Sequence, residues 1–310
     1  MKISIIIPVY RGEKTISALV DRLVSLKMPG ALEVVLVNDA SPDNSHQACV
    51  GIFKKHQGIV KYIRLARNFG EHNAVLAGLG HSTGDYAVII DDDFQNPPEE
   101  IAKLIDTAVQ GSFDVVYGEY EKKRHAWFRN LGSKFNDKVA CWLLGKPKDL
   151  YLCSFKCMSR FLIGEVIKYS GPFPYIDGLI LRVTRNIGKV IVRHDERKEG
   201  RSGYTLKKLY SLWSNMFVNF SVQPLRVATL LGLLFSGIAA AGILEIIIEK
   251  IFYPGLAHGI AWVIMAVLLF SGVQLTLLGM IGEYIGKQFL TVNQTPQYVI
   301  REMLSEERKA

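Results

Sequence analysis

Residues 86–100 read YAVIIDDDFQNPPEE and give the clearest indication of the fold. Segment 86–90 is short, apolar and rich in β-branched residues, which is typical of a buried strand. The residues after it predict a helix start, with Asn96 as the N-cap, Pro97 as the first helical residue and Glu99 as the capping-box partner. The five residues in between therefore form a turn at the carboxyl end of a strand, which is where open α/β sheets bind ligands.

The turn concentrates negative charge, because Asp91, Asp92 and Asp93 are consecutive and Gln95 follows them. Three crowded carboxylates repel one another unless a positive charge neutralises them. A hard divalent cation with oxygen ligands, Mg²⁺ or Mn²⁺, is the simplest partner. The alternative is a solvated acidic turn, since acidic loops are common.

Composition limits the class of protein. The 310 residues allow one large or two modest domains, and the mean hydropathy of +0.17 is high for a purely soluble protein. The apolar excess follows residue 225. The net charge of +8 comes with many basic residues between 120 and 210, just before the apolar region. This position favours an anionic membrane surface and phosphate ligands, and no nucleic-acid partner is expected, although the basic and aromatic segment 119–148 could also suit RNA.

Four cysteines indicate the compartment. No histidine or second cysteine pair completes a zinc pattern with Cys153 and Cys157, and Cys49 and Cys141 are isolated in the sequence. We interpret all four as reduced thiols, which predicts a cytosolic catalytic face. No signal peptide is visible at the N-terminus.

Strands and helices alternate over the first 120 residues. This order predicts an α/β fold with a mostly parallel sheet and helices on both faces. No G-x-G-x-x-G follows the first strand and no Walker A motif occurs, so a mononucleotide rather than a dinucleotide site is expected. The predicted strands are 3–10, 33–39, 60–65, 86–90 and 113–117, with a further strand at 190–192.

The C-terminal third has the pattern of a membrane-attached segment. Residues 206–222 place apolar side chains on one broad face, as interfacial helices do. Residues 227–244 and 260–281 carry no charge and are long enough to span a bilayer, although a buried core helix is the alternative for each. Basic residues before the first run and after the second predict a hairpin with both ends cytosolic. A short strand is expected around 297–300.

Four motifs occur in order along the chain and together resemble the family 2 glycosyltransferases of the GT-A (Rossmann-like) fold. They are Ile7-Pro8-Val9-Tyr10, Val37-Asn38-Asp39, Arg67-Asn68-Phe69-Gly70 and the segment from Asp91 to Glu99. The resemblance is to the polyprenyl-phosphate branch of that family, and it extends over essentially the whole chain. It implies an inverting transfer of a sugar from a nucleotide-sugar donor, most simply UDP-linked, to undecaprenyl phosphate.

Two other functions remain open at this stage. One is a nucleotide-sugar-binding membrane scaffold or sensor that has lost the chemistry, against which the complete set of acidic-turn residues argues. The other is a processive polysaccharide synthase, which usually needs a Gln-x-x-Arg-Trp motif and more spans than this sequence has.

The resemblance also implies roles for individual residues. The nucleotide sugar would be bound by Pro8, Tyr10, Asp39, Arg67, Asp92, Arg201 and Ser202. The metal would be held by Asp91, Asp93 and Gln95. Catalysis would depend on Asp91, Asp93, Arg129 and Arg197. For Asp39 the structural alternative is a turn or helix-entry aspartate, and for Arg67 a solvent-facing or ion-paired arginine.

The acceptor phosphate would be bound by Arg129 and Ser133, with contributions from Arg124 and Asp177, although Asp177 could also orient the sugar. The alternatives are a solvated charged face for the basic cluster and a helix cap for Asp177. His194 is expected to be structural or exposed, because nothing near it in the sequence completes a triad.

The predicted organisation has four parts. Residues 1–204 form a cytosolic GT-A domain, 205–224 an interfacial helix, 225–286 two transmembrane helices and 287–310 a cytosolic tail. The expected location is the inner, cytoplasmic membrane. The family resemblance further implies a homo-oligomer, a tetramer.

Overall fold

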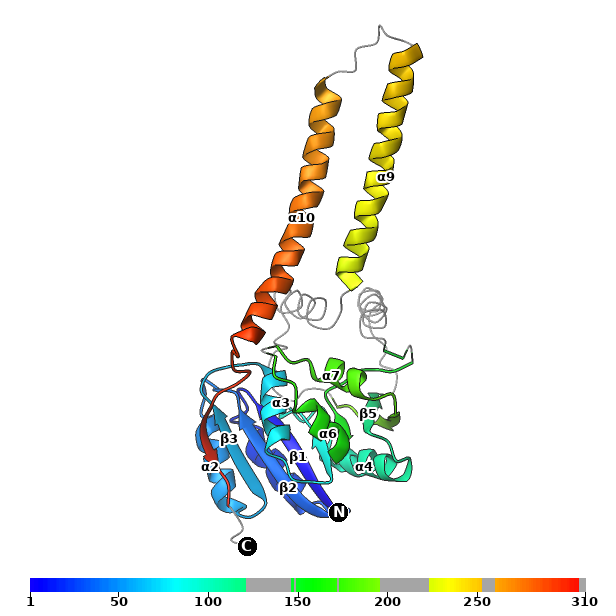
Figure 1. Ribbon diagram of the computed structural model, residues 1–310. Helices are drawn as coiled ribbons and strands as arrows, with labels where there is room; N and C mark the ends of the chain where they lie inside the picture. The colour runs from blue at the N-terminus through cyan, green and yellow to red at the C-terminus, as the bar shows by residue number, and fades with distance from the viewer. Residues whose placement is uncertain (121–145, 148, 172, 196–222, 253–259, 307–310) are drawn as a thin grey trace. The chain divides into compact units, whose positions relative to one another are not determined.

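The computed structural model describes residues 1–120, 146–147, 149–171, 173–195, 223–252 and 260–306 (Figure 1). The chain divides into two compact units. The first contains Met1–Thr205 together with Gln294–Ala310, and the second contains Leu206–Asn293.

The first unit is built on an eight-stranded mixed sheet in the order β7-β5-β6-β4-β1-β2-β3-β8. Its parallel half follows the predicted alternation of strands and helices. The strands of this half are β1 (Lys2–Val9), β2 (Ala31–Asn38), β3 (Val60–Leu65) and β4 (Tyr86–Ile89). The helices between them are α1 (Ile16–Ser25), α2 (Ser45–Lys55) and α3 (Glu71–Gly80).

The direction of the chain determines which face each helix covers. The connections through α1 and α2 run the same way across the sheet, and these two helices pack together. The chain reverses between β3 and β4, so right-handed crossover puts α3 on the opposite face. There α3 packs beside α6 (Arg160–Val166), as Figure 1 shows on the side toward the viewer. The expected α/β sheet with helices on both faces is therefore confirmed.

The other half of the sheet contains an antiparallel strand that the sequence pattern did not predict. Strand β6 (Lys156–Ser159) lies between β4 and β5 (Val115–Tyr120) and runs antiparallel to both. The expected strand at 113–117 thus extends the sheet only through β6 and begins two residues later. The remaining elements are α4 (Ile101–Gln110), α7 (Ile176–Val183) and β7 (Ile187–Val192), which is parallel to β5.

The C-terminal segment returns to this sheet. Strand β8 (Ile300–Leu304) pairs antiparallel with β3, and the Ala66 amide donates to the Val299 carbonyl at 2.8 Å. The strand lies slightly later than the expected 297–300. Residues beyond 293 are therefore part of the same folded unit as the N-terminal strands.

The predicted capping of the helix after the acidic turn is wrong. Pro97 is extended, with ψ 131°, and the helix begins with the 3₁₀ turn η1 (Pro98–Glu100). A residue that precedes proline is disfavoured in the helical region, so Pro98 keeps Pro97 out of the helix. The Asn96 side chain instead accepts a hydrogen bond from the Tyr120 hydroxyl at 3.0 Å, and Glu99 binds Arg22.

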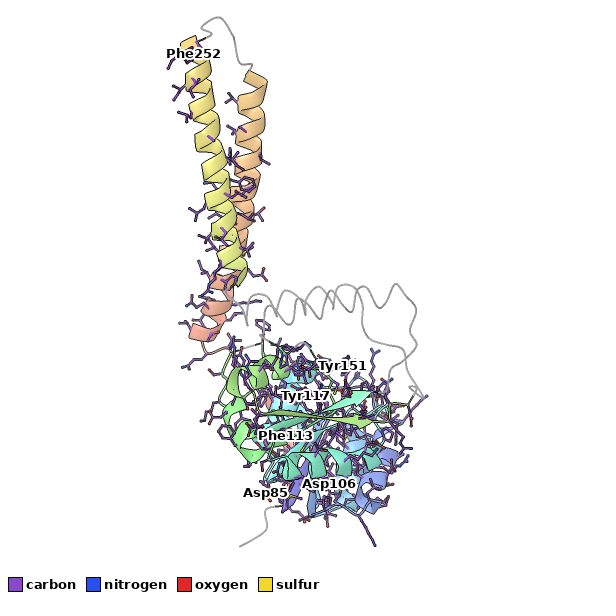
Figure 2. The ribbon with its side chains drawn as sticks, turned by 90° about the vertical axis from the view of Figure 1, so that its right-hand side faces the viewer. Asp85, Asp106, Phe113, Tyr117, Tyr151 and Phe252 are labelled. Atoms are coloured by element: carbon purple, nitrogen blue, oxygen red, sulfur yellow. The ribbon has the colours of Figure 1, made fainter. Side chains whose placement is uncertain are left out.

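The second unit contains two long helices, α9 (Gln223–Phe252) and α10 (Ile260–Val292). Figure 2 shows side chains projecting outward along both, and Phe252 at the end of α9 is 71% exposed. Among the described residues one stretch, Leu269–Val292, is long and apolar enough to cross a membrane, and a shorter apolar stretch covers Leu225–Phe235.

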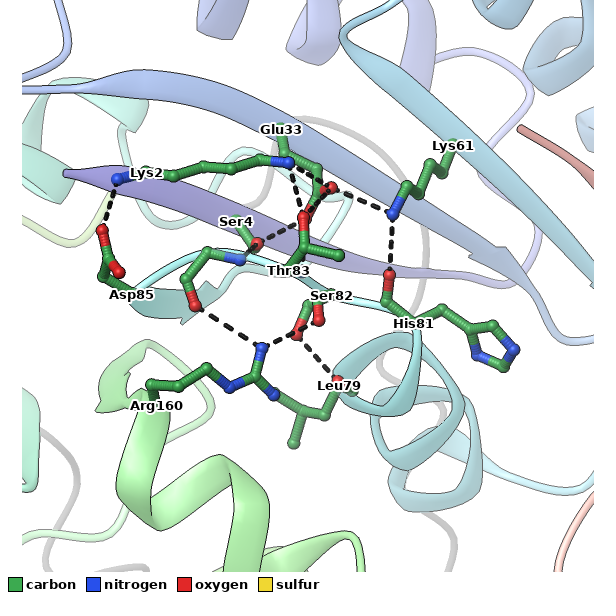
Figure 3. Close-up of polar contacts among 11 residues, drawn as sticks. Lys2, Ser4, Glu33, Lys61, Leu79, His81, Ser82, Thr83, Asp85 and Arg160 are labelled. Carbon is green, nitrogen blue, oxygen red and sulfur yellow. Dashed lines mark hydrogen bonds and ion pairs between the residues drawn. The ribbon is translucent and has the colours of Figure 1, made fainter. Parts of the chain in front are cut away.

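A polar network joins the starts of the parallel strands, at the edge opposite the acidic turn (Figure 3). Its centre is the carboxylate of Glu33, which accepts hydrogen bonds from Ser4 at 2.5 Å and from the backbone amide of Thr83 at 2.8 Å. The ammonium groups of Lys2 and Lys61 each lie 3.0 Å from the same carboxylate. This network holds the loop before β4 against β1 and β2. Strand β4 in turn leads directly into the acidic turn.

Candidate active site

The carboxyl ends of the parallel strands meet at one edge of the sheet, as the sequence predicts. The amide of Asp39 donates to the carbonyl of Val9 at 3.0 Å, which places the end of β2 beside the end of β1. The Asp39 carboxylate accepts hydrogen bonds from the backbone amides of Phe69 at 2.7 Å and Gly70 at 2.8 Å. Asp39 therefore connects the ends of β1 and β2 through its backbone amide, and the loop after β3 through its carboxylate.

These contacts give Asp39 a structural role, because they hold the loop that leads into α3. Burial raises the pKa of this carboxyl, and the two backbone amides oppose that effect. Each carboxylate oxygen can accept more than one hydrogen bond, so Asp39 retains capacity for a ligand. Arg67 in the same loop is exposed, and its guanidinium lies 4.7 Å from the centre of the Phe69 ring.

The acidic turn has a defined shape. Asp91 accepts a hydrogen bond from the Ser154 hydroxyl at 2.5 Å, and Asp93 accepts one from the backbone amide of Gln95 at 3.0 Å. The turn also passes very close to the loop after β1. A Cβ atom on Gly12 would lie 2.2 Å from a carboxylate oxygen of Asp92. Only glycine allows this approach without movement of the Asp92 side chain.

Electrostatics at this edge is dominated by carboxylates. Exclusion of water by the surrounding protein, followed by repulsion from Asp91, Asp177 and Asp93, raises the pKa of Glu71 to about 7, and Lys156 partly offsets this. Glu71 begins α3 and keeps a solvent-facing surface. The contributions of Asp91, Asp93 and Asp177 to this shift show that these carboxylates lie near the start of α3.

Strand β6 supplies residues that sequence reasoning missed. The buried ammonium of Lys156 forms an ion pair and hydrogen bond with Oδ1 of the buried Asp177. The hydroxyl of Tyr117 donates to the same oxygen at 2.9 Å. The Asp177 carboxylate is engaged by these two groups, and the N-cap of α7 is Tyr175, so the helix-cap interpretation of Asp177 is wrong. A lysine within a short polar-apolar segment gives no sequence signal for such a contact.

The predicted basic loop starts beside the acidic turn. The backbone amide of Asp195 donates to the carbonyl of Gln95 at 2.8 Å. Next to it, the His194 ring lies 4.1 Å from the Tyr120 ring, and its Nδ1 is 3.3 Å from Oδ1 of Asn96. These contacts agree with a structural role for His194.

Six predicted site residues lie outside the part of the chain that the structure describes. They are Arg124, Arg129, Ser133, Arg197, Arg201 and Ser202. The structure therefore brings together the predicted donor and metal residues of the sheet edge, with Asp177 added from α7, and leaves the basic residues as predictions.

Comparison with known proteins identifies the family. The model of Glycosyl transferase family 2 matches residues 4–163, which covers β1 through β6 and the acidic turn. The chain belongs to glycosyl transferase family 2. The family assignment made from the ordered motifs is thus confirmed.

Relatives of this glycosyltransferase match it along its whole length. It is 31% identical over 314 residues to the undecaprenyl-phosphate 4-deoxy-4-formamido-L-arabinose transferase of Yersinia pestis, covering 99% of this chain and 95% of the relative. The transferase of the same name from Sodalis glossinidius is 30% identical over 309 residues, covering 98% and 94%. These alignments include the second unit as well as the sheet.

Solved structures share the fold of this glycosyltransferase. Glucosyl-3-phosphoglycerate synthase of Mycobacterium tuberculosis, in complex with Mn²⁺, UDP and glucosyl-3-phosphoglycerate, aligns with a TM-score of 0.52 at 18% identity, covering 74% of this chain and 79% of the synthase. The GT-A fold expected from the motifs is confirmed.

The oxygen groups of the acidic turn suit a hard cation. Two carboxylates and an amide, from Asp91, Asp93 and Gln95, are available within five residues. Within the described ranges no group of three or more His, Cys, Asp and Glu side chains is arranged as a metal site. A cation here would therefore rely on the amide, on water and on the oxygens of a ligand to complete its coordination, as Mg²⁺ commonly does.

Proposed function

We propose that this glycosyltransferase moves a sugar from a nucleotide-sugar donor, most simply a UDP-sugar, to undecaprenyl phosphate. The observation that carries the proposal is the full-length match to undecaprenyl-phosphate sugar transferases, in a chain whose acidic turn and strand ends meet at one edge of the sheet. The product would be a polyprenyl-phosphate-linked sugar for cell-envelope glycan or lipid modification.

The donor nucleotide would lie over the ends of β1 and β2. Tyr10 is 44% exposed there and can stack on a base, next to Pro8, and the buried Asp39 can accept a hydrogen bond from the uracil edge. Arg67, from the loop after β3, would approach the diphosphate, with Asp92 nearby. Arg201 and Ser202 of the basic loop would close over the diphosphate, and the hydrogen bond from Asp195 to Gln95 supports this by bringing that loop to the acidic turn.

Asp91, Asp93 and Gln95 would hold Mg²⁺ or Mn²⁺. When bound, the cation supplies neutralisation of the charge that grows on the diphosphate as it leaves. The hydroxyl of Ser154 orients the Asp91 carboxylate, and the backbone N–H of Gln95 orients the Asp93 carboxylate. Arg197 would add a fixed positive charge from the basic loop.

The acceptor needs no dedicated base. A phosphate monoester is already largely anionic near neutral pH, since its second pKa is about 6. A phosphate oxygen would attack the anomeric carbon as the bond to the nucleoside diphosphate breaks, which inverts the anomeric configuration. Arg129 and Ser133, with Arg124, would hold that phosphate.

The second unit supports a membrane location. The side chains of Leu230, Leu233 and Leu275 are 66%, 66% and 69% exposed, and lipid would remove this apolar surface from water. The chain leaves the sheet unit after Thr205 and returns to it at Gln294, and β8 pairs with β3. A chain that returns to the same folded unit would cross a membrane an even number of times, which supports a hairpin of α9 and α10. The sheet and the tail would then lie on one side of the inner membrane, and we assign them to the cytosolic side.

The test is direct turnover. Purified full-length protein in neutral detergent is given undecaprenyl phosphate, Mg²⁺ or Mn²⁺, and a panel of UDP-sugars, and lipid-linked sugar is measured by mass spectrometry. One donor should be consumed in a metal-dependent way. Asp93→Asn should lower turnover by orders of magnitude while the protein remains folded. Unchanged turnover of folded Asp93→Asn in chelator would contradict the metal assignment, and no lipid-linked sugar with any donor would contradict the reaction.

A further inference from the structure

The chain around β6 brings the acidic turn and Asp177 close together. Ser154, just before the strand, donates to Asp91, and Lys156, two residues later, binds Asp177. Glu71, at the start of α3, interacts electrostatically with Asp91 and Asp93 and also with Asp177 and Lys156. The Asp177 carboxylate therefore lies near the predicted metal ligands.

The Asp177 carboxylate is held rigidly. Lys156 and Tyr117 both bind Oδ1, and the Lys156 ammonium also lies 5.0 Å from the centre of the Tyr117 ring. All three residues are at least 90% buried, with residue exposures of 3% for Lys156, 7% for Asp177 and 1% for Tyr117. Burial of an ion pair is not in itself a source of stability, because desolvation offsets the attraction. Such an arrangement is instead what fixes a functional group for recognition.

The second oxygen of this carboxylate has a different environment. Within the described residues both hydrogen bonds of Asp177 go to Oδ1, and none goes to Oδ2. An ionised carboxylate only accepts hydrogen bonds, so its partner must carry an O–H or N–H group. A fully ionised phosphate has no O–H group to donate and would be repelled by this carboxylate.

We infer that Asp177 accepts a hydrogen bond from a hydroxyl or amino group of the transferred sugar, and that Lys156 and Tyr117 are positioning residues for it. The inference rests on the proposed sugar transfer. It assigns Asp177 to recognition of the donor sugar rather than to the lipid phosphate, and thereby makes this residue a determinant of which sugar is accepted. The competing explanation is that the three residues only fasten α7 to the sheet.

The experiment compares donors that differ by one hydroxyl. The donor is the UDP-sugar of the panel that the wild-type full-length protein binds most tightly by calorimetry, and UDP is the sugar-free probe. Asp177→Asn should weaken binding of the UDP-sugar about 10-fold or more, as expected for a hydrogen bond to a charged group, and leave UDP binding unchanged. Among monodeoxy analogues of the donor, one should bind Asp177→Asn and wild type equally well. Equal losses for UDP and UDP-sugar, or for every analogue, would overturn the inference.

The role of Lys156 is tested through Asp177. If Lys156 acts only by positioning that carboxylate, Lys156→Met combined with Asp177→Asn should bind the UDP-sugar no more weakly than Asp177→Asn alone, and Lys156→Arg should retain most of the affinity. The double variant removes both buried charges, so it is less prone to unfold than Lys156→Met. Lys168→Met, which breaks the surface ion pair with Glu165, is the matched control and should bind normally. A further loss in the double variant would contradict the positioning role.

The proposed sugar transfer and the proposed role of Asp177 can be refuted independently. Absence of lipid-linked sugar with every donor refutes the proposed reaction, and it does not affect the binding comparison. A wild-type enzyme that turns over donor while Asp177→Asn shows no sugar-dependent loss refutes the present inference alone. If Asp177→Asn instead raised only the KM for undecaprenyl phosphate, Asp177 would belong to the acceptor site.

Discussion

Replacement of Glu33 by Gln should destabilise the sheet by about 3 kcal/mol. The side chain of Glu33 is only 4% exposed, and its carboxylate is the centre of the network in Figure 3. Burial alone would raise its pKa, but hydrogen bonds from Ser4, Thr83 and Lys2 outweigh burial and lower the pKa from 4.5 to about 2. At about 1.4 kcal/mol per pKa unit, this lowering of the pKa corresponds to a stabilisation of about 3 kcal/mol.

The sign of the pH dependence follows from the lowered pKa. The folded protein binds the proton more weakly than the unfolded chain, so the contribution is fully present above about pH 4.5 and is lost as the pH falls toward 2. Glu33→Gln carries no titrating group at this position. The stability gap between wild type and variant should therefore be widest near neutral pH and should narrow below pH 4.5.

Hydrogen exchange read by mass spectrometry measures this effect on the full-length protein in neutral detergent. Exchange of the β1 and β2 amides should be about 10²-fold faster in Glu33→Gln than in wild type at neutral pH, after correction for intrinsic rates. Asp21→Asn is the matched control, because the Asp21 side chain is 44% exposed and its pair with Lys55 is a surface contact. Exchange within about 3-fold of wild type, or a gap that does not narrow in acid, would refute the reasoning.

Three further predictions concern the site and the topology. Arg129→Ala should raise the KM for undecaprenyl phosphate at least about 10-fold and leave the donor KM unchanged in detergent kinetics, with partial rescue by Arg129→Lys; an unchanged acceptor KM would mean that Arg129 only attracts anionic lipid. Ser305→Cys, placed just after β8, should react with an impermeant maleimide in inside-out vesicles but not in intact cells, and labelling only from outside would overturn the hairpin. Gly12→Ala should lower kcat/KM about 10²-fold without loss of folding, because its Cβ would lie 2.2 Å from Asp92; activity near wild type would show that the turn can yield.

The parallel half of the fold was accessible from the sequence because each strand is a continuous apolar run bounded by turn residues. The predicted strand at Val60–Leu65 has the same bounds as β3, and the predictions for β1, β2 and β4 differ by one or two residues. Strand β6 could not be predicted from such a pattern. It has four residues, one of them a buried lysine, so neither alternation nor an apolar run identifies it. The start of α4 was misjudged for a local reason, since Pro98 acts on Pro97.

The candidate site likewise contains residues that the sequence predicted and residues that it did not. Residues at strand ends, such as Asp39 and Asp91, were predicted because the ends of parallel strands share one edge. Lys156 and Tyr117 were missed because their role depends on antiparallel pairing between segments about 40 residues apart. No local pattern reports such a pairing. The resemblance did point to Asp177, but its contacts come only from the structure.

The antiparallel insertion of β6 has a consequence for how donor and acceptor can meet. The proposed nucleotide half of the site lies at the ends of the parallel strands β1, β2 and β3, whereas Asp177 comes from α7, which follows β6 in the chain. Strand β6 pairs with both β4 and β5, and the chain here connects the two halves: Ser154, just before β6, binds Asp91, and Lys156, within β6, binds Asp177. A sugar held between the acidic turn and Asp177 would therefore lie where the two halves join. On the proposed assignment, the sugar would contact Asp177 while its diphosphate remains over the strand ends, so Asp177 could select the sugar without touching the leaving group.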